Sequence, residues 1–168
     1  VNQKNILFAN ELVKDNILYC TENKNINIDA LLLKFHLSLT IKNKLASSLS
    51  GGEKARVCLI MNLLKNPDIL LCDEVTAGLD EESAKIVFDI LKRESKRRLE
   101  VCVTHNLDIA NKYADKMFFI KDGVINNEMR LKCKTKKASK QRKIFKLQTL
   151  ISIIKHKLKY FCHIFKQR

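Results

Sequence analysis

The stretch LSGGEKARVCLIMNLLKNPDILLCDE, residues 49–74, decides the fold class, because a helix, a helix stop and a strand follow one another in it. Two adjacent glycines, Gly51 and Gly52, precede apolar residues at helical spacing, and the Asn-Pro-Asp at 66–68 ends that helix. The apolar run that follows is typical of a strand in the buried centre of a parallel sheet. A helix that leads into such a strand predicts an α/β fold.

The sequence after this stretch continues the same pattern. Residues 81–98 have an apolar stripe at helical spacing, and LEVCVTH at 99–105 is predicted to be a second buried strand. A further helix at 106–114 leads to a third strand, DKMFFI at 115–120, and to a short hairpin partner, VINN. This order predicts a sheet with right-handed crossovers, in which ligands bind at the carboxyl ends of the strands.

Positive charge is concentrated at one end of the 168 residues. Residues 1–125 carry 18 lysines and arginines against 17 acids, a net charge of +1; residues 126–168 carry 14 against one, a net charge of +13, and the two sum to the +14 of the chain. The sequence therefore predicts a nearly neutral globular part and a basic tail. Six cysteines without a CxxC spacing indicate a reducing compartment and no disulfide framework.

The glycine pair lies where a helix is predicted to begin, and two interpretations of it are open. The first N–H groups of a helix have no intrahelical acceptor, so Gly51, Gly52 and the hydroxyl of Ser50 predict the close approach of a phosphate. The alternative is a loose connector in which Ser50 caps the helix and Glu53 completes a capping box. The residues from Leu49 to Glu53 alone favour the connector, and the sequence downstream reverses that preference.

Polar residues end two neighbouring predicted strands. Asp73 and Glu74 follow the first strand, and His105 follows the second. One carboxylate beside a nucleotide can hold Mg²⁺, and the next can orient or deprotonate an attacking water. The alternative, in which the two acids cap the next helix, does not account for the histidine. We therefore expect Asp73 to be a magnesium ligand, Glu74 to be catalytic and His105 to lie near a γ-phosphate.

Taken in order, LSGGE, NPDILLCDE, TAGLD, VTHN and ADKMFFIKDG resemble the second half of the ATPase domain of an ATP-binding-cassette (ABC) transporter. The resemblance covers residues 1–125. It implies a partial P-loop NTPase sheet of the RecA-like kind, with a helical subdomain at about 11–66 and the core at 67–125. The basic tail, 126–168, is then a separate segment.

The resemblance also implies a role for each matching residue. The signature motif, which contacts nucleotide, corresponds to Leu49, Ser50, Gly51, Gly52 and Glu53. The strand Ile69–Asp73 corresponds to Walker B, with Asp73 at Mg²⁺, and Glu74 corresponds to the catalytic base. Asp80 corresponds to the D-loop residue near nucleotide, and His105 to the switch histidine, a catalytic residue. Gln3 corresponds to the Q-loop glutamine, which contacts nucleotide and Mg²⁺. The implied cofactors are ATP and Mg²⁺.

Partners follow from the same resemblance. In this family two cassettes form a head-to-tail dimer, and each ATP lies between the Walker A loop of one subunit and the signature helix of the other. No GxxxxGK[ST] loop occurs in these 168 residues. We therefore expect a truncated piece that alone binds ATP weakly or not at all and that completes the site of a second ABC ATPase subunit. The other implied partner is a transmembrane permease, fused downstream if the chain is of the macrolide- and lipoprotein-exporter type.

Two alternative functions remain open. Val75 and LSGGEKA are similar to chromosome-maintenance ATPases of the same superfamily, which act on DNA, and an inactive remnant is the third possibility. The short spacing from the signature motif to Walker B, the VTHN and the YADKMFFIKDG favour a transporter ATPase.

The basic tail has apolar residues at spacings of three and four among its lysines: Ile144, Leu147, Ile151, Ile154, Leu158, Phe161 and Phe165. This pattern predicts a basic amphipathic helix that binds an anionic membrane surface, with a solvated extension as the alternative. Nucleic acid is not expected as a partner, because the aromatic residues follow the apolar stripe and do not form separate stacking platforms. A tail that binds the membrane surface and a permease as partner together predict that the protein lies at the cytoplasmic face of a membrane.

Overall fold

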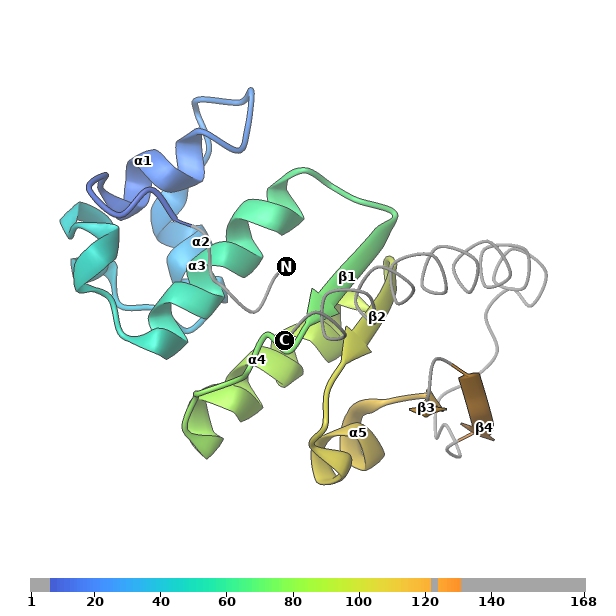
Figure 1. Cartoon of the computed structure of the whole chain (residues 1–168). Coiled ribbons are helices and arrows are strands. Elements are labelled where there is room, and N and C mark those ends of the chain that lie inside the picture. Colours follow the sequence, from blue (N-terminus) through green and yellow to red (C-terminus); the bar gives the residue numbers. More distant parts are fainter. Residues whose placement is uncertain (1–6, 122–123, 131–168) are drawn as a thin grey trace, which may run out of the picture. The chain divides into compact units, whose positions relative to one another are not determined.

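The computed structural model of the chain describes residues 7–121 and 124–130 (Figure 1). The chain divides into two compact units, Val1–Leu107 and Asp108–Arg168. The predictions for Gln3 and for the tail beyond residue 130 lie outside the described residues. No helix within the described ranges combines the length and the apolar character needed to cross a bilayer.

The first unit begins with a helical segment. It consists of α1 (Val13–Leu18), α2 (Ile28–Lys34), 3₁₀ turns at Leu39–Asn43 and Ala46–Ser48, and α3 (Gly51–Leu64). Asn27 caps α2, because its side chain accepts a hydrogen bond of 2.9 Å from the N–H of Ala30. The buried Asn16 holds the chain before α1, accepting from the N–H of Phe8 and donating to its carbonyl.

Helix α3 lies in the centre of this helical segment. Its residues 55–61 are all buried, so the helix is covered on every side and not on one stripe alone. The apolar side chains packed in this segment include Val13, Ile17, Leu32, Phe35, Ile41 and Leu59. The sequence predicted a helix from 51 to 66 with one inward stripe, and the structure shows a fully buried core helix that ends at Leu64.

The rest of the first unit is a strand–helix–strand crossover. Strands β1 (Ile69–Asp73) and β2 (Leu99–Val103) pair in parallel, with Ile69 opposite Leu99 and Asp73 opposite Val103. Helix α4 (Glu81–Glu94) connects them (Figure 1) and buries its apolar face: Ala84, Val87, Phe88, Ile90 and Leu91. The predicted α/β crossover is therefore confirmed, although α4 ends at Glu94 and not at 98.

The second unit contains α5 (Leu107–Tyr113, which begins at the boundary), β3 (Lys116–Lys121) and β4 (Val124–Arg130). Strands β3 and β4 form an antiparallel pair. The predicted third strand and its hairpin partner are thus present. Among the described residues β3 pairs with β4, while β1 and β2 form a sheet of their own. Only two residues separate β3 from β4, and so short a connection favours antiparallel pairing of its two strands.

Glu100 on β2 has an unusual environment for a carboxylate. Its Oε1 is buried and has no hydrogen-bond partner among the described residues. Burial first, and the Glu94 carboxylate second, raise the pKa of Glu100 from 4.5 to about 8, against the effects of Arg98 and Lys92. At a pH between 4.5 and about 8, Glu100 binds more protons in the folded state than in the unfolded chain. The free energy of unfolding therefore decreases as the pH rises through this window.

We expect Glu100→Gln to raise the free energy of unfolding at pH 8 by about 1 kcal/mol, a value reduced from the full shift because the carboxyl group is partly exposed. At pH 4.5 the expected gain is much smaller, because Glu100 is then protonated in the folded state. Urea denaturation at the two pH values measures the difference. Glu22→Gln, in an exposed loop, is the control. An equal effect of Glu100→Gln at both pH values would contradict the assignment.

Candidate functional site

Ser50, Gly51 and Gly52 form the turn at the start of α3, called the glycine turn below, and this turn contains a capping box. Ser50 has extended backbone angles, and its Oγ accepts a hydrogen bond of 3.2 Å from the N–H of Glu53. In return, Oε2 of Glu53 accepts from the N–H of Ser50 at 2.8 Å. The capping box that the sequence offered as an alternative is therefore present.

This capping box is compatible with anion binding. Ser50 Oγ uses a lone pair for Glu53, so its own O–H remains a donor. The N–H groups of Gly51 and Gly52 occupy the first two positions of α3, where a helix offers no acceptor. Ser50 and Gly51 are exposed, whereas Leu49 is buried and anchors the turn. The turn thus places three donors at the positive end of a fourteen-residue helix, two of them on exposed residues and the third on the buried Gly52.

The two glycines also have a packing role that the sequence did not reveal. A Cβ at Gly52 would lie 2.6 Å from Oγ and 3.0 Å from Cβ of Ser83 in α4, and one at Gly51 would lie 3.2 Å from Cδ2 of Leu79. The start of α3 therefore approaches the start of α4 more closely than a side chain at position 52 permits. The sequence offered anion approach or a loose connector for the two glycines and not this packing, because the contact joins segments about 30 residues apart.

The carboxyl ends of β1 and β2 bring Glu74 and His105 together. Glu74 lies in the left-handed region (φ 45°), and its N–H donates to the carbonyl of Val103 at 3.0 Å. Its Oε1 lies 2.7 Å from Nδ1 of His105, whose side chain is 78% exposed. A non-glycine residue in this backbone region is uncommon and is typical of functional sites. The arrangement holds one carboxylate and one imidazole at the edge where α/β sheets bind ligands.

Asp73 and Asp80 lie on either side of the turn that follows β1. Asp73 is the last residue of β1 and is partly exposed. Asp80 is the N-cap of α4, with Oδ1 accepting from the N–H of Ser83 at 2.8 Å. This hydrogen bond is the main reason why the pKa of Asp80 is below its ordinary value. The residue that caps α4 is therefore Asp80, and not Asp73 or Glu74.

The oxygen donors at this edge suit a magnesium ion that keeps most of its ligands from water and phosphate. Among the described residues there is no cluster of three or more His, Cys, Asp or Glu side chains that could hold a metal. Mg²⁺ commonly uses only one or two protein carboxylates together with water and phosphate oxygens. Asp73 at the strand end fits that requirement.

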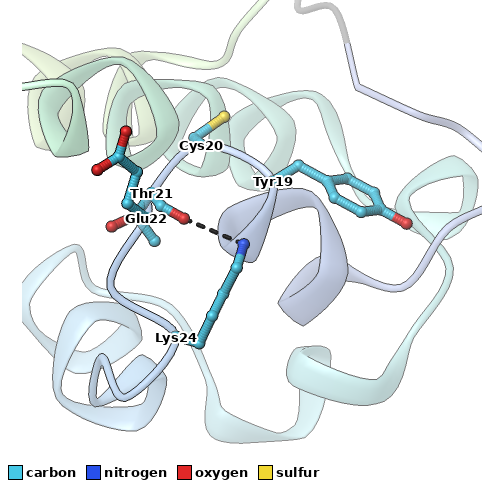
Figure 2. Close-up of a pocket in the computed structure, with 5 residues that line it drawn as sticks. All are labelled: Tyr19, Cys20, Thr21, Glu22 and Lys24. Carbon is cyan, nitrogen blue, oxygen red and sulfur yellow. Dashed lines mark hydrogen bonds between the residues drawn. The ribbon is translucent and has the colours of Figure 1, made fainter.

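A surface hollow in the helical segment lies apart from these residues in the sequence. It is lined by Tyr19, Cys20, Thr21, Glu22 and Lys24 (Figure 2). The ammonium group of Lys24 donates to the carbonyls of Leu18 and Thr21 at 2.9 and 3.1 Å. The lysine therefore closes the loop after α1, and its charge is already engaged by the backbone.

Arg56 is a residue near the site that sequence reasoning did not identify. It lies on α3, one turn after Gly52, and is only 8% exposed. The signal in the sequence is a charged residue at 56 within the apolar run 55–61. Sequence alone does not distinguish this position from an exposed helix position, because α3 is covered on all sides only in the folded unit.

Comparisons with known proteins found similarity to ABC transporter proteins. The family model described as "ABC transporter" matches residues 1–77. The glutamate transport ATP-binding protein GluA of Corynebacterium glutamicum is 34% identical over 127 residues, which are 71% of this chain and 52% of GluA. The lipoprotein-releasing system ATP-binding protein LolD of Desulfotalea psychrophila is 38% identical over 104 residues, 61% of this chain and 46% of LolD.

Solved structures agree on the fold. A dimeric post-hydrolysis structure of the ATP-binding cassette MJ0796 with ADP and Pi matches with a TM-score of 0.66 at 23% identity, over 78% of this chain and 61% of that one. The chain spans about half the length of GluA, and 12% of ABC transporter A family member 10 of Dictyostelium discoideum, to which it is 36% identical over 107 residues. The chain is therefore similar in sequence to the ATP-binding proteins of ABC transporters and shares the fold of the ABC cassette.

Proposed function

We propose that this chain is part of the ATP-binding and ATP-hydrolysing domain of an ABC transporter, and that its glycine turn completes an ATP site held by a second cassette. The observation that carries this proposal is the start of α3. There the hydroxyl of Ser50 and the N–H groups of Gly51 and Gly52 form a set of donors at the positive end of a helix, in which Ser50 and Gly51 are exposed and Gly52 is buried. Such a set binds a γ-phosphate that another subunit presents.

The carboxyl end of β1 supports a hydrolytic role on the same chain. Asp73 would hold the Mg²⁺ that offsets the phosphate charge, and Glu74 would orient or deprotonate the attacking water. His105 holds the Glu74 carboxylate at 2.7 Å, which keeps that oxygen at the strand end. Asp80, at the start of α4, would face the same nucleotide.

Partners and location belong to the same proposal. The cassette structures that share this fold are dimeric, which supports pairing with a second ABC ATPase, and we infer that this pairing is head-to-tail. By their names, GluA belongs to glutamate transport and LolD to a lipoprotein-releasing system, which favours a transmembrane permease over DNA as the partner. We infer that the domain works at the cytoplasmic face of a membrane, and that the basic tail contacts anionic lipid there.

The test is association that depends on the γ-phosphate. The chain is mixed with a complete cassette that has an intact Walker A loop and a glutamine in place of its catalytic glutamate, and the complex is followed by analytical ultracentrifugation. We expect a heterodimer with Mg²⁺-ATP and none with Mg²⁺-ADP. Ser50→Ala is expected to weaken the ATP-dependent complex about tenfold, because it removes a charge-assisted donor.

Ser47→Ala provides the matched control, because Ser47 is exposed and lies outside the turn at the start of α3. This variant should associate like the wild type. Equal association in ATP and ADP, or tight Mg²⁺-dependent ATP binding by the chain alone, would contradict the proposal.

A further inference from the structure

Arg56 lies directly beneath the glycine turn. If Gly52 carried a Cβ atom, that atom would lie 3.5 Å from Nη1 of Arg56. The same Cβ would also contact Ser83. Helix side chains lean toward the N-terminus, so a side chain at 56 covers the turn that contains position 52. The guanidinium is therefore buried where α3 meets the start of α4.

Two of the three side-chain nitrogens of this arginine lack partners. Nε and Nη1 are buried and have no hydrogen-bond partner among the described residues. Buried polar atoms are nearly always paired, because an unmade hydrogen bond is costly. If the position served stability alone, an apolar side chain of similar length would fill it without that cost. The positive charge itself therefore needs an explanation.

Two carboxylates act on this charge. Burial lowers the pKa of Arg56, whereas Glu53 and then Asp80 raise it. The Glu53 carboxylate is held at the glycine turn by its 2.8 Å hydrogen bond from the N–H of Ser50. A phosphate that approaches Gly51 and Gly52 therefore meets a negative charge at the same turn. The partial charge of a helix N-terminus is only about half of an elementary charge, so it does not offset a full carboxylate.

We propose that Arg56 is a positioning residue that acts as the buried counter-charge to Glu53 and so allows the glycine turn to accept a phosphate group. This inference rests on the proposed function, because it takes the turn as the phosphate-binding surface. Arg56 acts through the charge of Glu53 and not by touching the phosphate, since its side chain is buried and its Nε and Nη1 are closed off from solvent. Glu53 in turn keeps the capping box that orders the donors.

The experiment is a titration of the ¹⁵N-labelled chain with ATP and, separately, with inorganic phosphate, followed through the amide signals of Gly51 and Gly52. In the wild type we expect progressive shifts with a weak affinity. Arg56→Met should lower that affinity about tenfold, and Arg56→Lys should keep most of it, because the charge remains. Adding Glu53→Gln to Arg56→Met should restore the affinity to within about threefold of the wild type, because the uncompensated carboxylate is removed.

The rescue separates charge compensation from a structural role. If Arg56 had only a structural role, its replacement would lower the urea midpoint, and adding Glu53→Gln would not restore binding. We expect instead that the urea midpoint of Arg56→Met does not fall. Lys54→Met is the matched control, because it removes a positive charge from the same turn of the helix at a less buried position. It should change the affinity less than Arg56→Met does.

Each result decides between the two proposals. Equal shifts in the wild type and in Arg56→Met would overturn the role of Arg56 and leave the proposed function intact. Absence of shifts at Gly51 and Gly52 in the wild type would overturn the phosphate-binding turn itself, and the role of Arg56 with it. If Arg56→Met does not fold, Glu53→Gln alone decides: it should raise the affinity, and an unchanged affinity would overturn the inference.

Discussion

Replacing Glu94 with alanine is expected to lower the free energy of unfolding by about 3 kcal/mol, because the change leaves a buried cation without its carboxylate. Glu94 is 4% exposed at the end of α4. Its Oε1 lies 3.1 Å from Nζ of Lys34, and its Oε2 lies 3.5 Å from Nη2 of Arg98, whose side chain is 8% exposed. Arg98 keeps a hydrogen bond to the carbonyl of Pro67, which places the expected loss at the lower end for a broken buried pair.

The same ion pair joins two parts of the first unit. Lys34 ends α2 in the helical segment, and Glu94 ends α4 in the crossover. A second contact, from Nη2 of Arg93 to the carbonyl of Lys34 at 3.0 Å, runs between the same two elements. The loss on Glu94→Ala should therefore affect both parts together, and a single urea transition with a lower midpoint is expected.

Asp29→Ala is the matched control for Glu94→Ala. It breaks the 2.8 Å pair of Asp29 with Lys42, in which the side chains are 48% and 34% exposed. The expected loss is under about 1 kcal/mol, because solvent screens an exposed pair. Urea denaturation of the two variants and the wild type measures both values. A loss for Glu94→Ala no larger than that for Asp29→Ala would contradict a buried link at this position.

The second large effect is expected for Gly52→Ala, which should lower the free energy of unfolding by about 1–3 kcal/mol through overpacking. An alanine inside a helix is ordinarily more stable than a glycine by about 0.5–1 kcal/mol, so the expected sign is opposite to helix propensity. The reason is the Ser83 side chain, which lies 2.6 Å from the position of the new Cβ. Differential scanning calorimetry or urea denaturation measures the change.

Two further variants test that this contact is the cause. Gly51→Ala is the matched control, since its Cβ would meet only Leu79 Cδ2 at 3.2 Å, and the end of a leucine can shift. Ser83→Gly should relieve the clash in the Gly52→Ala background, with a coupling energy of about 1 kcal/mol or more in a double-mutant cycle. Equal losses for Gly51→Ala and Gly52→Ala, or additivity with Ser83→Gly, would contradict the explanation.

Local patterns in the sequence predicted much of what the structure shows. The helix at 51–64 and the strand at 69–73 follow from the spacing of apolar residues and from the Asn-Pro-Asp at 66–68. The capping box follows from a serine and a glutamate three residues apart. The proximity of Glu74 and His105 follows from two parallel strands that end at one edge. Each of these depends on neighbours along the chain, or on one sheet rule.

The sequence by itself determined the order of the helices and strands that follow residue 50, the capping box at Ser50 and the motifs that resemble an ABC ATPase. Only the tertiary structure decided how α3 is buried and what surrounds its first turn. The close approach of Gly52 to Ser83, the unpaired Nε and Nη1 of Arg56 and the link from Glu94 to Lys34 all arise between segments that are distant in sequence or inside a fully covered helix. Such contacts depend on the packing of one element against another, which local spacing does not specify.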